Sequence, residues 1–225
     1  MLSQNLPQHQ TRTSPQLRTA LIAGAVAGPL YVAIGTLEAL LRDGFDIRIH
    51  SLSLLANGAG GWMHSTMMIV SGLLTVIGAL GVSTVQQRTG RRSYAMITGL
   101  VIYGFGVATA GFLRADPAEG FPIGTPPGPP LVITASGLGH LVAGSVGFLG
   151  LIVACLACAR RSARAGDRSW AGCSLVIGVY YLVAFAGIAL GAGNPVINIA
   201  FTVAVALGWG WLTALCIRAL TGRVC

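Results

Sequence analysis

Six long apolar segments dominate this sequence, and only short polar stretches separate them. They span residues 19–41, 62–85, 93–113, 131–159, 170–191 and 196–217. Each is about 20 residues or longer, which is the length of helix that crosses the ~30 Å hydrocarbon core of a bilayer. Only 9% of the residues are charged, whereas soluble domains carry about 25%. We therefore expect an all-α fold, a six-helix transmembrane bundle, and exclude a soluble enzyme, a disordered chain and a disulfide-stapled secreted domain.

The chain divides into a tail and a membrane domain. Residues 1–16 are polar and predict a short disordered cytoplasmic tail. Residues 17–225 leave no room for a soluble domain and predict a single six-span membrane domain. The first apolar run is longer than the ~7–15-residue core of a signal peptide, so we expect a retained transmembrane helix. Small residues spaced four apart in the fourth run (Gly139, Ala143, Gly147) predict close helix packing inside the bundle.

The arginines predict the orientation. All 14 basic residues are arginine, and 11 of them fall on the side of the bundle that carries both chain ends. Because cytoplasmic loops are enriched in Lys and Arg, we expect both termini in the cytoplasm and a multi-pass protein of the cell inner (plasma) membrane. Tryptophans near the interfaces then act as anchors, with Trp62 outside and Trp170, Trp209 and Trp211 inside.

The net charge of +8 does not indicate a nucleic-acid surface. The arginines flank apolar segments in short loops and form no stripe interleaved with aromatic side chains. We expect the lipid bilayer as the partner, a small-molecule or lipid ligand, and no nucleic acid. The cluster of Arg160, Arg161 and Arg164 sets topology or contacts anionic headgroups. The sequence leaves the oligomeric state open.

Acids and histidines gather on the opposite side of the bundle. Five of the six acids and three of the four histidines fall on or near this outer face. Ionisable groups are costly within a membrane and tend to face a bundle interior or a wet cavity. We therefore expect function at the outer face. The eight residues are Glu38, Asp43, Asp46, Asp116, Glu119, His50, His64 and His140.

Two of these groups lie inside predicted helices. His140 is about 13 Å into the fourth run, where it is either a site residue or an imidazole satisfied by a backbone carbonyl or by Ser136. Glu38 is about one turn from the end of the first helix, and we expect it to reach the interface or to pair with Arg42. His64, at a helix end, is expected at the interface.

The first outer loop, residues 42–61, contains Asp46 and His50, which lie one turn apart if the loop is helical. A carboxylate beside an imidazole fixes its tautomer and supports acid–base chemistry or metal ligation. The other interpretation is an interfacial segment in which carboxylates pair with arginines. Asp43 and His50 are candidate ligand-binding residues here.

The second outer loop, residues 114–130, contains six of the ten prolines. Proline fixes φ and removes a hydrogen-bond donor, so this segment is neither a helix nor a central strand. A helix connection usually takes about 2–8 residues, so the length favours a lid over the outer mouth rather than a plain connector. Asp116, Glu119 and Thr125 are the candidate site residues in this loop.

Short motifs in and after these loops form a characteristic set. They are Asp43-Gly44-Phe45-Asp46, His50-Ser51-Leu52-Ser53, Gly61-Trp62, Asp116-Pro117, Gly120-Phe121-Pro122, Gly124-Thr125-Pro126 and His140. With this set the chain resembles the domain of unknown function 998 family of bacterial and archaeal membrane proteins, from the first helix to the sixth. The resemblance implies the same polytopic architecture. It brings no established activity and no catalytic residues.

Three functions fit these observations. The first is a non-catalytic membrane protein that binds a small ligand or lipid at its polar outer mouth. Asp43, His50, Glu119 and Thr125 are the residues expected to bind it. No pattern names a cofactor.

The second function is an intramembrane enzyme acting on a lipid or isoprenoid substrate. Asp46, Asp116 and His140 are its candidate catalytic acid–base groups, or a metal is held by His50, His64 and His140 together with a carboxylate. The third is a structural role without a ligand. Whether the chain is an enzyme stays open at this point.

Overall fold

The structure, a computed structural model, describes residues 14–90, 92–191 and 194–224. Most of the predicted tail, residues 1–13, lies outside the described residues. Within them there are six α-helices and no strand; a single bridge joins Ala118 to Phe121. The helices are α1 (Pro15–Leu41), α2 (Gly61–Arg88), α3 (Tyr94–Phe112), α4 (Ala135–Arg164), α5 (Arg168–Leu190) and α6 (Pro195–Leu220).

All six helices are long and apolar enough to cross a membrane. The expected all-α, six-helix transmembrane architecture is therefore confirmed, and the chain is a multi-pass membrane protein. The shortest helix, α3, has 19 residues and is about 28 Å long, close to the thickness of the hydrocarbon core.

Local capping chemistry sets the helix bounds, several of which differ from the hydropathy boundaries. α1 begins at Pro15, four residues before the apolar run, because the Ser14 hydroxyl accepts the Leu17 N–H. α4 begins at Ala135, four residues after the start of its apolar run, because the Thr134 hydroxyl accepts the Gly137 N–H. α4 then continues to Arg164, through arginines that an apolar pattern does not count as helix.

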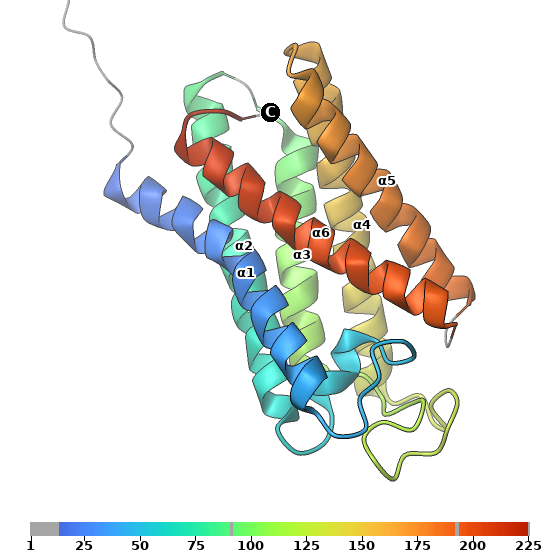
Figure 1. Ribbon diagram of the computed structural model, residues 1–225. Helices are drawn as coiled ribbons and strands as arrows, with labels where there is room; N and C mark the ends of the chain where they lie inside the picture. Colours follow the sequence, from blue (N-terminus) through green and yellow to red (C-terminus); the bar gives the residue numbers. More distant parts are fainter. Residues whose placement is uncertain (1–13, 91, 192–193, 225) are drawn as a thin grey trace, which may run out of the picture.

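The helices form two layers of three, with α2, α3 and α4 in one layer and α1, α6 and α5 in the other (Figure 1). Each helix packs against its neighbours in the chain, and α6 packs against α1 to close the ring. α6 crosses the other layer obliquely (Figure 1). The start of α1 and the end of α6 lie at one end of the bundle, and the two long loops lie at the other.

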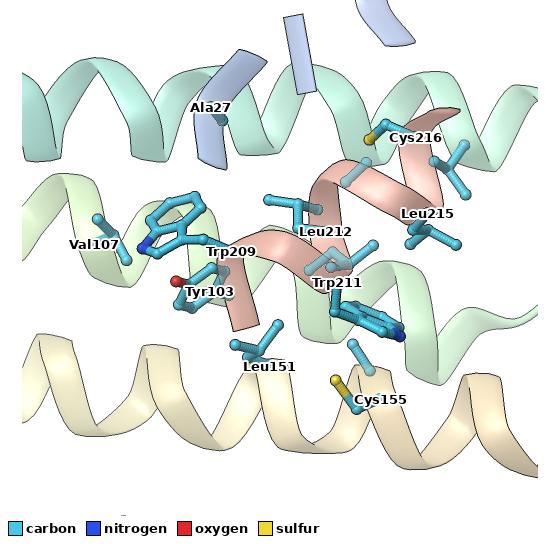
Figure 2. Packing of buried hydrophobic residues seen from close by; sticks show 14 of the residues in the cluster. Ala27, Tyr103, Val107, Leu151, Cys155, Trp209, Trp211, Leu212, Leu215 and Cys216 are labelled. Atoms are coloured by element: carbon cyan, nitrogen blue, oxygen red, sulfur yellow. The ribbon is translucent and has the colours of Figure 1, made fainter. Parts of the chain in front are cut away.

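Side chains from α6 fill the space between the layers. Trp209, Leu212 and Leu215 are completely buried and meet residues of α3 and α4 such as Tyr103 and Leu151 (Figure 2). Small residues bring the helices of one layer together. A Cβ added at Gly106 of α3 would lie 2.6 Å from the Gly147 Cα of α4. The small-residue spacing in the fourth helix therefore serves packing within this chain, as expected.

The two long loops, residues 42–60 and 113–134, pack against each other and form what we call the cap. The first loop contains a short 3₁₀ helix, η1 (Leu52–Ala56). A small apolar core of Leu54, Leu55 and Phe121 holds the two loops together. Asn198 of α6 ties the cap to the bundle, since its amide donates to the carbonyls of Ile47 (2.8 Å) and His50 (2.9 Å).

Candidate functional site

A cavity of about 180 Å³ lies inside the bundle, directly beneath the cap. All six helices contribute to its wall, and residues 51–53 of the cap line it at the end nearest the two long loops. Aromatic side chains from five of the helices make up much of the wall. They are Tyr31, Tyr103, Phe148, Phe185, Phe201 and Trp209.

These aromatic rings pack against one another in two groups. Tyr31 stacks on Trp209 with centroids 4.8 Å apart, and Tyr103 lies 5.1 Å from the same indole. Phe148 and Phe201 make edge-to-face contact at 5.3 Å. Aromatic pairs at these distances add about 0.5–1.5 kcal/mol each beyond their buried area, so we expect the wall of the cavity to be stiff.

The lining of the cavity is more exposed towards α4, α5 and α6 than towards α1, α2 and α3. The lining residues on α1, α2 and α3 are buried, whereas Phe185, Ile188 and Thr202 on α5 and α6 are half-buried. Leu141 of α4 also lines the cavity, and its exposed fraction is 58%. In a bundle that crosses a membrane, an opening on this side faces the acyl chains of the lipid rather than water.

His140 presents a hydrogen-bond acceptor to the cavity. Its Nδ1 lies 2.8 Å from the carbonyl oxygens of both Ala110 and Leu113. Carbonyl oxygens only accept, so Nδ1 must carry a proton and donate it. In the neutral imidazole, Nε2 is then an acceptor, and among the described residues nothing donates to it. Backbone carbonyls, rather than Ser136, hold the ring; the Ser136 hydroxyl instead donates to the Arg114 carbonyl (3.1 Å).

Trp209 presents an unpaired donor. Its side chain is completely buried, and among the described residues its indole N–H has no hydrogen-bond partner. Figure 2 shows the indole nitrogen directed towards Val107, another residue of the cavity wall. Leaving a buried donor unpaired costs about 1–3 kcal/mol. Because the nitrogen has almost no accessible surface, it packs against its neighbours and does not face the open space of the cavity.

Trp209 was expected near the inner interface, and that expectation is wrong. The residue lies about midway along α6 and inside the bundle. Its depth within the sixth apolar run indicated a position away from the interface. Tyr31 and Tyr103, which meet it across the bundle, were not recognised from the sequence, because a single chain shows which helix a ring belongs to but not which way it faces.

His50 has a structural role within the cap. The ring is 2% exposed; its Nδ1 accepts the Asp46 N–H (2.8 Å), and its Nε2 donates to the Glu119 carbonyl (2.9 Å). Both ring nitrogens are thus used in joining the two loops. The Asp46 backbone, rather than its carboxylate, fixes the tautomer, because the segment bends through a turn and brings the N–H to the ring.

The Asp46 carboxylate binds Arg48 instead. The arginine donates to it from Nε and from a terminal nitrogen, the latter at 2.7 Å. These side-chain hydrogen bonds lower the pKa of Asp46 to about 2. Two interpretations of this loop were left open, a carboxylate–imidazole pair and a segment in which carboxylates pair with arginines. The second one fits the carboxylate of Asp46.

Asp116 anchors the second loop to the start of α4. Its carboxylate accepts the Thr134 N–H (3.0 Å) and the Thr134 hydroxyl (2.6 Å). It also lies against Gly137, where a Cβ would overlap its oxygens. A carboxylate at a helix N-terminus is stabilised by the helix dipole.

The other loop candidates do not reach the cavity either. Asp43 is exposed. Glu119 contributes its backbone, donating to the Gly128 carbonyl (2.8 Å), and Thr125 closes a turn onto the Pro122 carbonyl (2.9 Å). Among the predicted site residues, His140 is the one that lines the cavity.

A second polar feature was not predicted as a pair. Glu38 and His64 are buried together, with Glu38 Oε2 2.7 Å from His64 Nδ1 and side-chain exposures of 2% and 0%. The other carboxylate oxygen and the other ring nitrogen have no partner among the described residues. The expectations that Glu38 reaches the interface or pairs with Arg42, and that His64 lies at the interface, are wrong. Arg42 instead donates to the carbonyls of Leu55 and Asn57 in the cap.

The three histidines considered as metal ligands sit in three different environments. His50 joins the cap loops, His64 pairs with Glu38, and His140 lines the cavity. Within the described part of the chain, no group of three or more His, Cys, Asp or Glu side chains is placed to hold a metal ion.

Comparison with known proteins gives one match. The family model described as "Protein of unknown function (DUF998)" matches residues 25–218, which is most of the chain. No curated protein and no solved structure matches.

Proposed function

Because this chain belongs to the DUF998 family, whose description assigns no activity, we propose its function from the cavity: it binds one end of a membrane amphiphile within the bundle. The ligand enters from the bilayer between α4 and the α5–α6 pair. Its polar end meets His140, and its tail remains among the lipid chains. The protein resides in the cell inner (plasma) membrane with both termini in the cytoplasm, so the cap faces outwards.

The size of the cavity supports this proposal. Pockets for whole drug-sized ligands measure about 300–1,000 Å³, whereas the present cavity measures about 180 Å³. An engineered cavity of about 150 Å³ in another protein takes up benzene. A complete lipid does not fit, but a single ring or a short chain end does, provided that the rest of the molecule remains outside. The open side of the cavity lets the rest of the molecule extend into the bilayer.

The chemistry of the lining favours binding over catalysis. The described lining residues include no carboxylate, no cysteine and no arginine. The acid–base chemistry considered for Asp46, Asp116 and His140 needs one of these carboxylates beside the imidazole. Neither aspartate lines the cavity, because the first binds Arg48 and the second binds Thr134.

The single observation that carries the proposal is the half-open cavity lined by His140, whose Nε2 has no donor among the described residues, and filling the cavity is the test. Gly144 lines the cavity, and a Cβ added there meets only the Phe148 ring, at 3.9 Å. Gly144→Leu therefore occupies the cavity. Gly210→Leu is the matched control, since Gly210 of α6 is exposed and a Cβ there meets nothing within 4 Å.

The probe is 4-decylphenol, a ring of suitable size on an alkyl tail, added to full-length protein in lipid nanodiscs. A saturable rise in the unfolding temperature reports binding, because a ligand that binds only the folded state stabilises it. The proposal predicts saturation for the wild type and for Gly210→Leu, and none for Gly144→Leu. Saturation of all three proteins alike, or of none, contradicts it.

A further inference from the structure

The polar atoms of the cavity narrow the chemical class of the ligand. We infer that the bound end is a hydroxylated aromatic ring, a phenol or hydroquinone carried on a lipid tail. This inference rests on the proposed function, since it concerns the occupant of the same cavity. It adds two features, a ring and a hydroxyl, that binding of an apolar chain end does not require.

The ring follows from the wall. Six aromatic side chains surround a space slightly larger than a cavity that accepts benzene. A planar ring stacks against aromatic neighbours at spacings like the 4.8 Å already present between Tyr31 and Trp209. A saturated chain end gains burial in such a space but none of this stacking.

The hydroxyl follows from His140. Its Nε2 needs a donor, because Nδ1 is committed to the carbonyls of Ala110 and Leu113. A hydroxyl group supplies that donor, whereas an ether or ester oxygen supplies only an acceptor and leaves the histidine unpaired.

The position of His140 orients the ligand. His140 of α4 and Tyr103 of α3 both line the cavity. The side towards the lipid is lined by Leu141, Phe185 and Ile188, which are apolar, and by Thr202. The hydroxyl therefore lies at His140, and the tail points towards the bilayer.

The test compares three probes in nanodiscs containing wild-type protein. They are 4-decylphenol, decylbenzene, which lacks the hydroxyl, and 1-hexadecanol, which lacks the ring. Affinities are expressed per mole fraction of probe in the bilayer, so that differences in partitioning do not enter. We expect 4-decylphenol to bind at least about tenfold more tightly than either of the others, as a recovered hydrogen bond to a buried group predicts.

His140→Phe removes the acceptor and keeps an aromatic ring, so it should reduce the preference for 4-decylphenol over decylbenzene about fivefold or more, while binding of decylbenzene shows that the variant still folds. Trp62→Phe is the control, because Trp62 lies at the start of α2 and is 66% exposed. If 4-decylphenol and decylbenzene bind equally tightly, the inference that the ligand carries a hydroxyl is wrong. If 1-hexadecanol binds as tightly as 4-decylphenol, the inference that the ligand carries a ring is wrong. In both cases the proposed function survives if Gly144→Leu abolishes the binding, whereas no saturable binding of any probe overturns both.

Discussion

The carboxylate of Asp46 illustrates how one neighbouring residue controls a group in the cap. Two nitrogens of Arg48 bind it, and the pKa falls from its ordinary value of 3.8 to about 2. Because the pKa is lower in the folded chain, the pairing contributes fully above about pH 4 and is lost as the pH falls towards 2. The side chain faces solvent, so we expect a local effect on the cap.

Replacing the arginine should reverse this shift. In Arg48→Gln the hydrogen bonds to the carboxylate weaken, and we expect the pKa of Asp46 to rise towards 3.8. Carbon-13 NMR titration of the Asp46 side chain measures it. Arg164→Gln, at the opposite end of the bundle, is the control and should leave the titration unchanged. Identical titration curves in Arg48→Gln and the wild type would show that Arg48 does not hold this carboxylate in solution.

The buried pair of Glu38 and His64 predicts strong coupling between two residues. Removing one partner leaves the other polar group buried without its hydrogen bond, whereas removing both leaves an apolar contact. We expect Glu38→Leu and His64→Phe each to destabilise the protein, and the double variant to lose about 1–2 kcal/mol less than the sum of the two. Unfolding of the three variants in mixed micelles provides the cycle. Additivity within about 0.5 kcal/mol would mean that the two groups do not interact.

At this scale the sequence identified the residues better than their partners. Charge scarcity singled out His50, His140 and Asp116, and each has a defined role. Their partners are largely backbone atoms: the Glu119 carbonyl, the Ala110 and Leu113 carbonyls, and the Thr134 N–H. Backbone atoms occur at every residue, so composition and spacing do not reveal which one a side chain will meet.

The pairing of α3 with α4 depends on glycines that let the two backbones approach. At Gly106 an added methyl group would meet the Gly147 Cα at 2.6 Å and the Ala143 carbonyl at 2.7 Å. Backbone atoms do not move aside as a flexible side chain does. A single methyl at this crossing must therefore push the helices apart.

We expect Gly106→Ala to destabilise the folded state by about 1–3 kcal/mol, the usual cost of overpacking. Gly210→Ala places the same methyl in open space on α6 and should be neutral or stabilising by up to about 1 kcal/mol, since alanine favours helix. Reversible unfolding in mixed micelles compares the two variants. Equal stability of Gly106→Ala and Gly210→Ala would argue against close contact between α3 and α4.

The helices were predictable because their cause is local. A run of about 20 apolar residues must satisfy its backbone internally in lipid, and only a helix does so within one segment. The cap was predictable only in part. Prolines predicted a shaped second loop, but the core that joins it to the first loop brings Phe121 against Leu54 and Leu55. That contact is long-range in sequence and leaves no local pattern.

The arginines predict the orientation of the whole bundle, and direct measurement tests this prediction. With both termini in the cytoplasm, a cysteine at Ile123 in the cap should react with an impermeant maleimide from outside intact cells, and one at Ala163 should react only after permeabilisation. Both positions are exposed, and a background without native cysteines removes interference. The reverse pattern of labelling would invert the bundle and place the cap inside the cell.

The interior cavity is a property of the whole molecule, because its wall comes from all six helices. The most direct test of its function is to locate a bound probe by photo-crosslinking. A 4-decylphenol analogue with a diazirine beside its ring is irradiated with wild-type protein in nanodiscs, and the labelled peptides are mapped by mass spectrometry. We predict labelling of residues 141–148, 185–188 and 201–205 that excess 4-decylphenol competes away. Labelling confined to lipid-facing positions such as Val153 and Val183, and unaffected by the competitor, would contradict binding inside the bundle.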